Sequence, residues 1–338
     1  MNAGNNAFHI RKSLRIVIAT LLPLLPLIAV NDAQACAACG DTLSKDWGTQ
    51  GVRSTPGFTA DLSYNYINQN QLRNGSGTAS TAQINSLLPS GQEVEDYTTT
   101  RTTTASLYYT GDTWGISAQL PYVQRTHGTF GNTLPGDYST YSSSSDSGIG
   151  DIRVIGRYTG LSTDKTAGII AGIKLPTGST DTNFNAGDEA GNALDRSLQI
   201  GTGSTDVFVG GFLTGSVEEY GWFAQGTLQH AVATKTIAGE DYRPGDAYSL
   251  NTGIRRAKFG AKFTPMLQLN FLHRRPDDVG GVALDGGTLA YLAPGALVRI
   301  GGGTSIYGFV QLPVYQNVRG LQLTPRYTAT LGVSHTFE

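Results

Sequence analysis

The chain has 338 residues, and its 24 lysines and arginines nearly balance 26 aspartates and glutamates, which leaves a net charge of −2. This balance argues against nucleic acid or another polyanion as a partner. Charged residues make up 15% of the chain, below the roughly 25% of soluble domains. After residue 35 no apolar run reaches the ~20 residues of a membrane-spanning helix. Such a chain enters a membrane only as a closed β-barrel, because each backbone polar group must be bonded internally.

Residues 1–35 have the pattern of a secretory signal peptide. Arg11, Lys12 and Arg15 precede an apolar stretch over 16–30, and Ala33-Gln-Ala matches a cleavage site. A transmembrane helix is the alternative, but the stretch is too short to span a bilayer and two prolines interrupt it. We therefore expect export and a mature chain that begins at Cys36.

The segment 36–55 is predicted to be periplasmic, and it opens with the motif Cys36-Ala-Ala-Cys39. In an oxidising compartment these cysteines form a disulfide or stay as thiols. A metal or redox site is an alternative, whereas the glycine at residue 40, in place of the histidine of a haem attachment motif, argues against haem. Lipid attachment to Cys36 is a third interpretation, although Ala-Gln-Ala lacks the usual leucine three places before the cysteine.

Residues 56–338 show the alternation of β-strands. In the last strand Tyr327, Leu331 and Phe337 lie on one face, and Thr328 and Thr330 lie on the other, because side chains alternate with a period of two. An apolar face backed by a small polar face is typical of a wall between lipid and water. Twelve strands are predicted, over 57–68, 98–110, 113–125, 148–159, 166–175, 205–215, 220–231, 248–258, 261–273, 288–300, 304–315 and 323–337. The alternation is ambiguous in 205–215, 288–300 and 304–315.

The connections between these strands alternate in length. Long ones follow the odd-numbered strands, at 69–97, 126–147, 176–204, 232–247 and 274–287, and short ones follow the even-numbered strands. Outer-membrane barrels have short periplasmic turns and long external loops. The sequence therefore predicts an all-β, antiparallel up-and-down transmembrane barrel with both ends in the periplasm. The long connections, including the serine-rich 139–147, are expected to be solvated loops.

Aromatic residues recur near the predicted strand ends, where rings favour the boundary between lipid and water. The predicted girdles comprise Tyr64, Tyr66, Tyr108, Tyr109, Trp114, Tyr122, Tyr158, Tyr220, Trp222, Tyr248, Tyr307, Tyr315 and Phe337.

Charged residues occupy the faces that are predicted to point into the barrel. They are Asp61, Asp151, Arg153, Arg157, Lys174, Asp206 and Arg255, with Arg299 as a further candidate. Buried charges persist only when they are paired or hydrated. One interpretation is a selectivity constriction like the charged rings of channels, and the other is a set of ion pairs that braces the barrel. Both interpretations predict that Asp151 and Arg153 tolerate substitution poorly.

Several stretches together resemble a known family. They are Ser147-Gly-Ile-Gly-Asp-Ile-Arg, Lys174-Leu-Pro-Thr-Gly, Leu198-Gln-Ile-Gly-Thr-Gly-Ser-Thr-Asp and Gln311-Leu-Pro-Val-Tyr-Gln followed by Gly320-Leu-Gln-Leu. Over residues 100–338 the chain is similar to the outer-membrane barrel family named for the MetA pathway of phenol degradation. The resemblance implies a β-barrel with a transport role and leaves the solute undefined. Cys36-Ala-Ala-Cys39 and the long insertion 69–97 do not match the family.

These patterns lead to one main hypothesis. The chain is predicted to be a monomeric outer-membrane channel, and not an enzyme, that passes small hydrophobic or aromatic solutes by diffusion without a cofactor. Its expected partners are outer-membrane lipid and lipopolysaccharide, the solute, and the barrel-assembly machinery through the strand that ends at Phe337. A non-conducting structural or adhesive barrel is the alternative. A membrane-embedded hydrolase is the third, but no histidine has a serine in an evident nucleophile setting.

Overall fold

The computed structural model describes residues 43, 48–50, 56–90, 93–237, 240–256 and 262–337. The barrel strands are β1 (Gly57–Gly75), β3 (Glu95–Thr110), β4 (Trp114–Thr129), β5 (Ser142–Ile149), β6 (Ile152–Tyr158), β7 (Ala167–Leu175), β8 (Thr205–Val217), β9 (Tyr220–Ala233), β12 (Ala247–Arg256), β13 (Phe263–Arg274), β16 (Gly287–Gly301) and β17 (Thr304–Thr336). The connections hold β2 (Gly77–Thr78), α1 (Thr81–Leu87), β10 (Thr236–Ile237), β11 (Glu240–Arg243), β14 (Asp277–Val279), β15 (Val282–Leu284) and the 3-10 turns η1 (Leu88–Ser90), η2 (Tyr138–Thr140) and η3 (Arg196–Leu198).

The barrel strands form a closed antiparallel ring in the order β17-β16-β13-β12-β9-β8-β7-β6-β4-β3-β1, and β1 pairs again with β17. Strand β17 crosses the wall twice. Its residues 304–318 pair with β16 and its residues 318–336 pair with β1. Strands β5 and β6 both pair with β4 and share one place in the ring. The described chain therefore crosses the wall twelve times in eleven ring strands, which confirms the predicted barrel.

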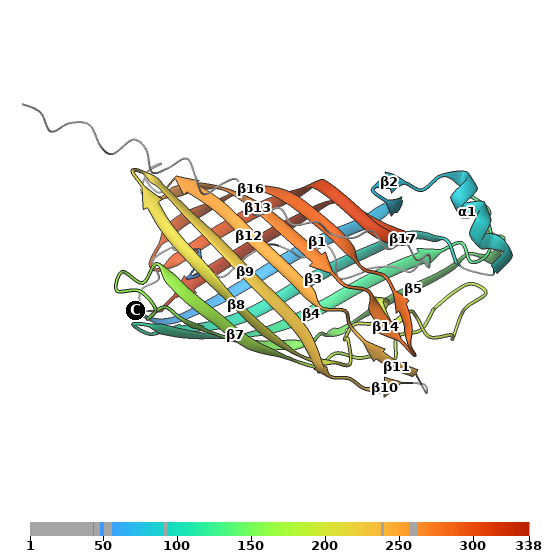
Figure 1. The fold of residues 1–338 in the computed structure, drawn as a ribbon, viewed down its shortest axis with the longest axis horizontal. Helices are drawn as coiled ribbons and strands as arrows, with labels where there is room; N and C mark the ends of the chain where they lie inside the picture. The colour runs from blue at the N-terminus through green and yellow to red at the C-terminus, as the bar shows by residue number, and fades with distance from the viewer. Residues whose placement is uncertain are drawn as a thin grey trace, which may run out of the picture. The chain divides into compact units, whose positions relative to one another are not determined.

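Long and short connections lie at opposite ends of the barrel. The elements β2, α1, β10 and β14 gather at one end, and the C-terminus lies at the other (Figure 1). One short turn joins β16 to β17 through Gly302 and Gly303, with φ of 54° and 73°. Two successive positive φ values match the twist of a tight hairpin and favour glycine. The end with the long connections corresponds to the predicted external side.

The outer face of the wall is apolar, as the alternation predicts. In the second half of β17, Leu331 is 60% exposed, whereas its neighbour Thr330 is 4% exposed. The same alternation separates exposed Leu269 from buried Gln268 in β13. Aromatic rings border this face near the end with the C-terminus, where Tyr109 lies 5.0 Å from both Phe58 and Trp114 between ring centroids. The wall therefore presents hydrocarbon-compatible side chains outward.

This arrangement predicts a large penalty for a charge in the middle of the outer face. We expect Leu331→Arg to lower the free energy of unfolding by about 2–4 kcal/mol in lipid vesicles, because the guanidinium would lie in hydrocarbon. Urea titration of the refolded barrel measures this loss, and Leu331→Met serves as the control of similar volume. Equal stabilities of the two variants would contradict a lipid-facing Leu331.

Two features differ from the prediction. The serine-rich segment expected as a solvated loop is mostly strand β5, which pairs with residues 122–129 of β4. Main-chain pairing decides its conformation, and its inward serines, Ser142 and Ser144, are buried. Tyr108 and Tyr307, expected in the aromatic girdles, point inward and are buried as well. The inner face thus carries aromatic side chains among its polar ones.

Candidate functional site

The barrel interior holds a cavity of about 410 Å³. It is lined by inward residues of the wall, by Arg196 to Thr202 of the connection between β7 and β8, and by Leu43 and Thr49 from the segment before β1. Its volume lies in the ~300–1,000 Å³ range of small-molecule sites. We call this cavity the chamber, and we call the two chain segments that enter the lumen the external plug (residues 176–204) and the N-terminal plug (residues 43 and 48–50).

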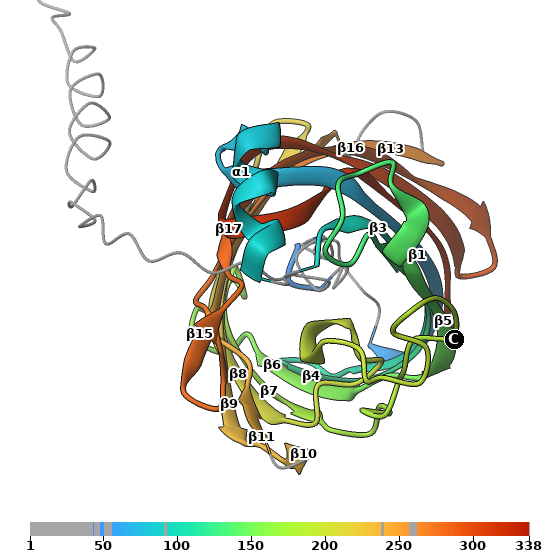
Figure 2. The same ribbon diagram turned by 90° about the vertical axis from the view of Figure 1, so that its right-hand side faces the viewer.

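The external plug lies within the ring of strands (Figure 2). Three buried charged residues at the ends of the neighbouring strands hold it. The Lys174 ammonium lies 2.8 Å from an Asp206 carboxylate oxygen and 3.6 Å from an Asp151 carboxylate oxygen. Since one cation faces two anions, further hydrogen bonds are needed to stabilise the charges.

The plug supplies those hydrogen bonds. Thr202 donates its hydroxyl and its backbone N–H to the Asp151 carboxylate, at 2.7 Å and 3.0 Å, and the Gly178 N–H donates at 3.0 Å. Ser204 donates to the Asp206 carboxylate at 2.6 Å. Asp151, Lys174 and Asp206 therefore form a charged anchor that ties both ends of the external plug to the wall.

The middle of the external plug is fixed separately. Arg125 of β4 donates to the carbonyl oxygens of Leu198 and Gln199, both at 2.7 Å. Leu198 packs with Phe184 and Leu194 in a buried apolar cluster. This packing corrects the expectation that the connection is a solvated loop, because its apolar side chains are buried against one another inside the barrel.

The N-terminal plug contacts the opposite part of the lumen. Leu43 packs in a cluster with inward residues that include Met266, Tyr307 and Phe309. Thr49 donates to the Gln225 side chain at 2.7 Å, and Arg255 donates to the Gln50 carbonyl oxygen. The apolar cluster fills the lumen beside Met266 of β13 and the facing residues of β16 and β17. The chamber is lined mainly by the other strands, and Leu272 and Arg274 of β13 also line it.

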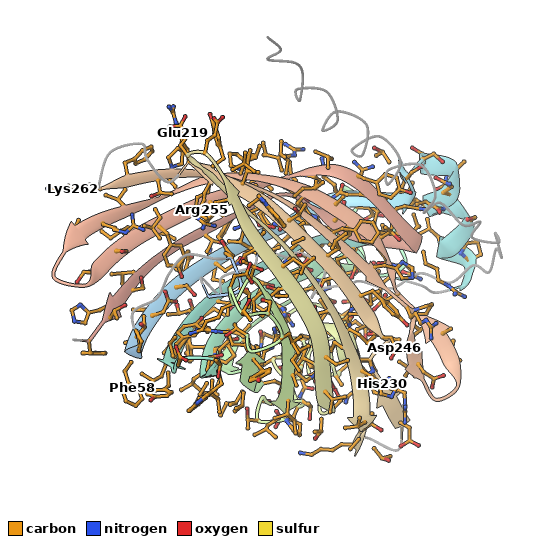
Figure 3. The ribbon with its side chains drawn as sticks, turned by 60° about the vertical axis from the view of Figure 1, so that its left-hand side comes forward. Phe58, Glu219, His230, Asp246, Arg255 and Lys262 are labelled. Carbon is orange, nitrogen blue, oxygen red and sulfur yellow. The ribbon has the colours of Figure 1, made fainter. Side chains whose placement is uncertain are left out.

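The predicted inward charges occupy separate places along the wall. Asp151, Lys174 and Asp206 form the charged anchor. Arg157 lies close to Gly48 of the N-terminal plug. Arg255 donates to the Gln50 carbonyl oxygen and lies toward the end that also carries Glu219 and Lys262 (Figure 3). Asp61 lines the chamber and accepts hydrogen bonds from the Tyr307 hydroxyl at 3.0 Å. Arg299 donates to Thr264 of β13 at 3.4 Å.

Arg153 differs from the other predicted charges, because its contact is a ring. Its guanidinium carbon lies 5.6 Å from the ring centroid of Phe208, and both residues line the chamber. Sequence reasoning overlooked Phe208, which lies in a strand of ambiguous alternation, and Arg125, which falls at the end of a predicted strand. Cys36 and Cys39 lie outside the described residues.

The histidines do not assemble a hydrolytic site among the described residues. His127 is buried and shares a hydrogen bond with Thr98 at 2.9 Å, and His273 shares one with Thr288 at 2.9 Å. His230 lies 2.6 Å from Asp246 at the external end (Figure 3). A nucleophilic serine would need a histidine within hydrogen-bond reach, and none of these contacts supplies one.

In the described ranges there is also no cluster of His, Cys, Asp or Glu suited to a metal ion, and no helix has the length and apolar character to span a membrane.

The external plug carries a carboxylate with an altered pKa. Burial raises the pKa of Asp195 from 3.8 to about 6, and the carboxylates of Glu93 and Glu95 are its acidic neighbours. Because this pKa is higher in the folded protein, the folded state binds the extra proton between pH 4 and 6 and loses that stabilisation as the pH rises.

We expect the external plug to loosen as the pH rises from 5 to 8, because ionised Asp195 then repels its acidic neighbours. Ion conductance across a planar bilayer is expected to increase over this interval. Asp195→Asn is expected to reduce the increase without abolishing it, because burial raises the pKa of Glu93 to about 7 and Glu93 ionises over the same interval. Asp188→Asn, at an exposed position of the same connection, is the control. An undiminished pH response in Asp195→Asn would contradict this origin.

Comparison with solved structures identifies the class of fold. No family model and no curated protein matches the sequence. Among solved structures, the COG4313 outer membrane channel from Pseudomonas putida F1 superposes with a TM-score of 0.61 at 12% identity, covering 84% of this chain and 97% of that one. The translocator domain of the autotransporter NalP from Neisseria meningitidis gives 0.49 at 11% identity, covering 84% and 90%. The CymD monoaromatic hydrocarbon channel gives 0.47 at 9% identity, covering 88% and 94%.

The chain therefore has the fold of outer-membrane β-barrels. Within that class its fold is similar to that of a channel. The resemblance to the phenol-degradation family has no matching family model and stays a prediction.

Proposed function

We propose that this protein is an outer-membrane channel through which small solutes, hydrophobic or aromatic ones among them, pass by diffusion. The observation that carries the proposal is the chamber, a water-accessible volume inside a wall whose outer face is apolar. The likeness in fold to an outer membrane channel supports the same function.

The remaining expectations belong to the same proposal. Residues 1–35 direct export, and the segment 36–55 comes from the periplasmic side, with Leu43 and residues 48–50 inside the lumen. The strand ending at Phe337 serves recognition by the assembly machinery. The barrel works as a monomer in contact with outer-membrane lipid and lipopolysaccharide, and it has no catalytic role. Membrane fractionation and light scattering of the purified barrel test the location and the monomeric state.

A non-conducting barrel is the second candidate, because the external plug and the N-terminal plug both occupy space in the lumen. Two measurements on the purified protein separate the candidates. Planar bilayers report ion current, and swelling of proteoliposomes in sugars and amino acids of increasing size reports solute passage. A channel gives discrete current steps and a size cut-off. Neither current nor swelling from a correctly folded barrel would overturn the channel and favour the structural role.

A further inference from the structure

Two neighbouring rows of inward residues cross the chamber wall between β6 and β8. The pairing register aligns Ile155, Gly172 and Phe208 in one row. It aligns Arg153, Lys174 and Asp206 in the next. Side chains two residues apart on a strand share a face, so an apolar row lies directly beside a charged row. Gly172 has no side chain, and Ile155 and the Val154 carbonyl oxygen pack closely over it, so Ile155 and Phe208 supply the apolar surface of this row.

The charges that line the chamber are unequally neutralised. Each carboxylate of the lining has a cation or a hydrogen-bond donor close to it. Asp151 and Asp206 share Lys174, Asp277 lies 3.5 Å from Arg274, and Asp61 accepts from Tyr307. Among the lining arginines, Arg125 and Arg153 are met by neutral groups, and in the described part of the chain neither forms an ion pair with a carboxylate. Arg196, which also lines the chamber, lies over the Tyr242 ring. Arg125 and Arg153 therefore bring positive charge to the chamber without a carboxylate partner.

Of these two arginines only Arg153 is available to a solute. Arg125 uses one guanidinium nitrogen on two plug carbonyls and another on Thr100. The Arg153 guanidinium instead lies over the Phe208 ring, and Arg153 is an exposed residue of the chamber lining. A cation stacked on a ring keeps its in-plane N–H donors for a planar anion, and arginine binds carboxylates through two such donors.

We propose that the chamber binds an aromatic carboxylate, with its carboxylate on Arg153 and its ring against the row formed by Ile155, Gly172 and Phe208. This inference deepens the proposed channel function and rests on it, since the chamber is the suggested pathway. A neutral hydrocarbon would bury Arg153 without supplying an acceptor, which costs free energy. A small inorganic anion would leave the apolar row in contact with water. A flat ring with one carboxylate covers the apolar row with its ring and gives Arg153 an acceptor.

The test uses benzoate, with benzamide as the neutral ring and cyclohexanecarboxylate as the anion without an aromatic face. Binding to the full-length barrel in detergent is measured by saturation-transfer NMR and calorimetry at pH 8, and block of KCl current is measured in planar bilayers. We expect benzoate to bind at least tenfold more tightly than benzamide. Arg153→Gln is expected to remove this preference, and Arg153→Lys is expected to retain part of it.

The variants separate the role of the charge from that of the ring. Phe208→Leu is expected to reduce the preference for benzoate over cyclohexanecarboxylate several-fold, because it removes the aromatic surface and keeps an apolar side chain. Arg101→Gln removes the same charge from an exposed position of β3 outside the chamber lining, and it is expected to bind benzoate like the wild type. The heat-modified mobility of each variant in SDS gels verifies folding.

The outcomes distinguish this inference from the channel proposal. Suppose that the protein conducts KCl but binds benzamide as tightly as benzoate, or that Arg153→Gln binds benzoate like the wild type. Either result overturns the aromatic carboxylate site and is compatible with the channel function. A protein that binds benzoate through Arg153 but conducts nothing overturns the channel and retains the binding site.

Discussion

Lys174→Met is expected to release the external plug and to raise channel conductance several-fold. The substitution leaves Asp151 and Asp206 buried without a cation, and breaking a buried ion pair in this way costs about 3–5 kcal/mol. The two carboxylates then repel each other across the site that the ends of the plug occupy. Current measurements in planar bilayers and urea unfolding in vesicles report the two effects.

A matched control exists within the same chain. Lys165 pairs with Asp112 at the end of the barrel with the short turns, where both side chains are exposed. An exposed pair of this kind contributes about 0–1 kcal/mol, so Lys165→Met is expected to leave conductance unchanged and stability nearly so. If Lys174→Met behaved like Lys165→Met, the charged anchor would not hold the plug. Adding Asp206→Asn to Lys174→Met is expected to recover part of the stability, because it removes one of the two unpaired charges.

Leu43→Asp is expected to displace the N-terminal plug from the lumen and to produce the second large rise in conductance. Leu43 packs against Met266, Leu297 and Phe309, and a carboxylate among these side chains is strongly unfavourable. The hydrogen bonds of the barrel wall do not depend on Leu43, so the barrel itself is expected to remain folded. Current per channel in planar bilayers is the measurement.

Leu43→Met is the matched control, because a swap of similar volume costs less than about 1.5 kcal/mol. It should leave the current per channel close to that of the wild type. A barrel with Leu43→Asp that is folded and conducts no more than Leu43→Met would show that the N-terminal plug does not limit flow. Combining Leu43→Asp with Lys174→Met should raise conductance further than either change, since the two plugs contact different parts of the wall.

The strands whose alternation is ambiguous in the sequence are informative in the structure. In β8, β16 and β17 the inward face carries Phe208, Phe212, Tyr291, Tyr307 and Phe309. Apolar residues then lie on both faces, outward against lipid and inward in the lumen, and the period of two is lost. Phe208 lines the chamber, whereas Tyr307 and Phe309 pack with Leu43 of the N-terminal plug. Ambiguity in these strands marks the places where apolar side chains face the lumen.

Sequence reasoning alone placed the candidate charges on the inward faces of strands, because parity in a strand is local. It left open whether these charges select solutes or brace the barrel. In the structure, different charged residues suit the two roles. Asp151, Lys174 and Asp206 hold the external plug, while Arg153 meets Phe208 and the open chamber. The division depends on contacts between residues that are 23 to 55 positions apart.

The sequence by itself determined the closed barrel, the outward apolar faces and the sorting of long and short connections, because each depends on the two-residue period or on spacing along the chain. Only the tertiary structure decided which connection enters the lumen, that 142–149 pairs as a strand, and that Leu43 packs inside the wall. Such placements depend on contacts between residues far apart in the sequence that form only when the barrel closes. The local two-residue period does not predict these contacts.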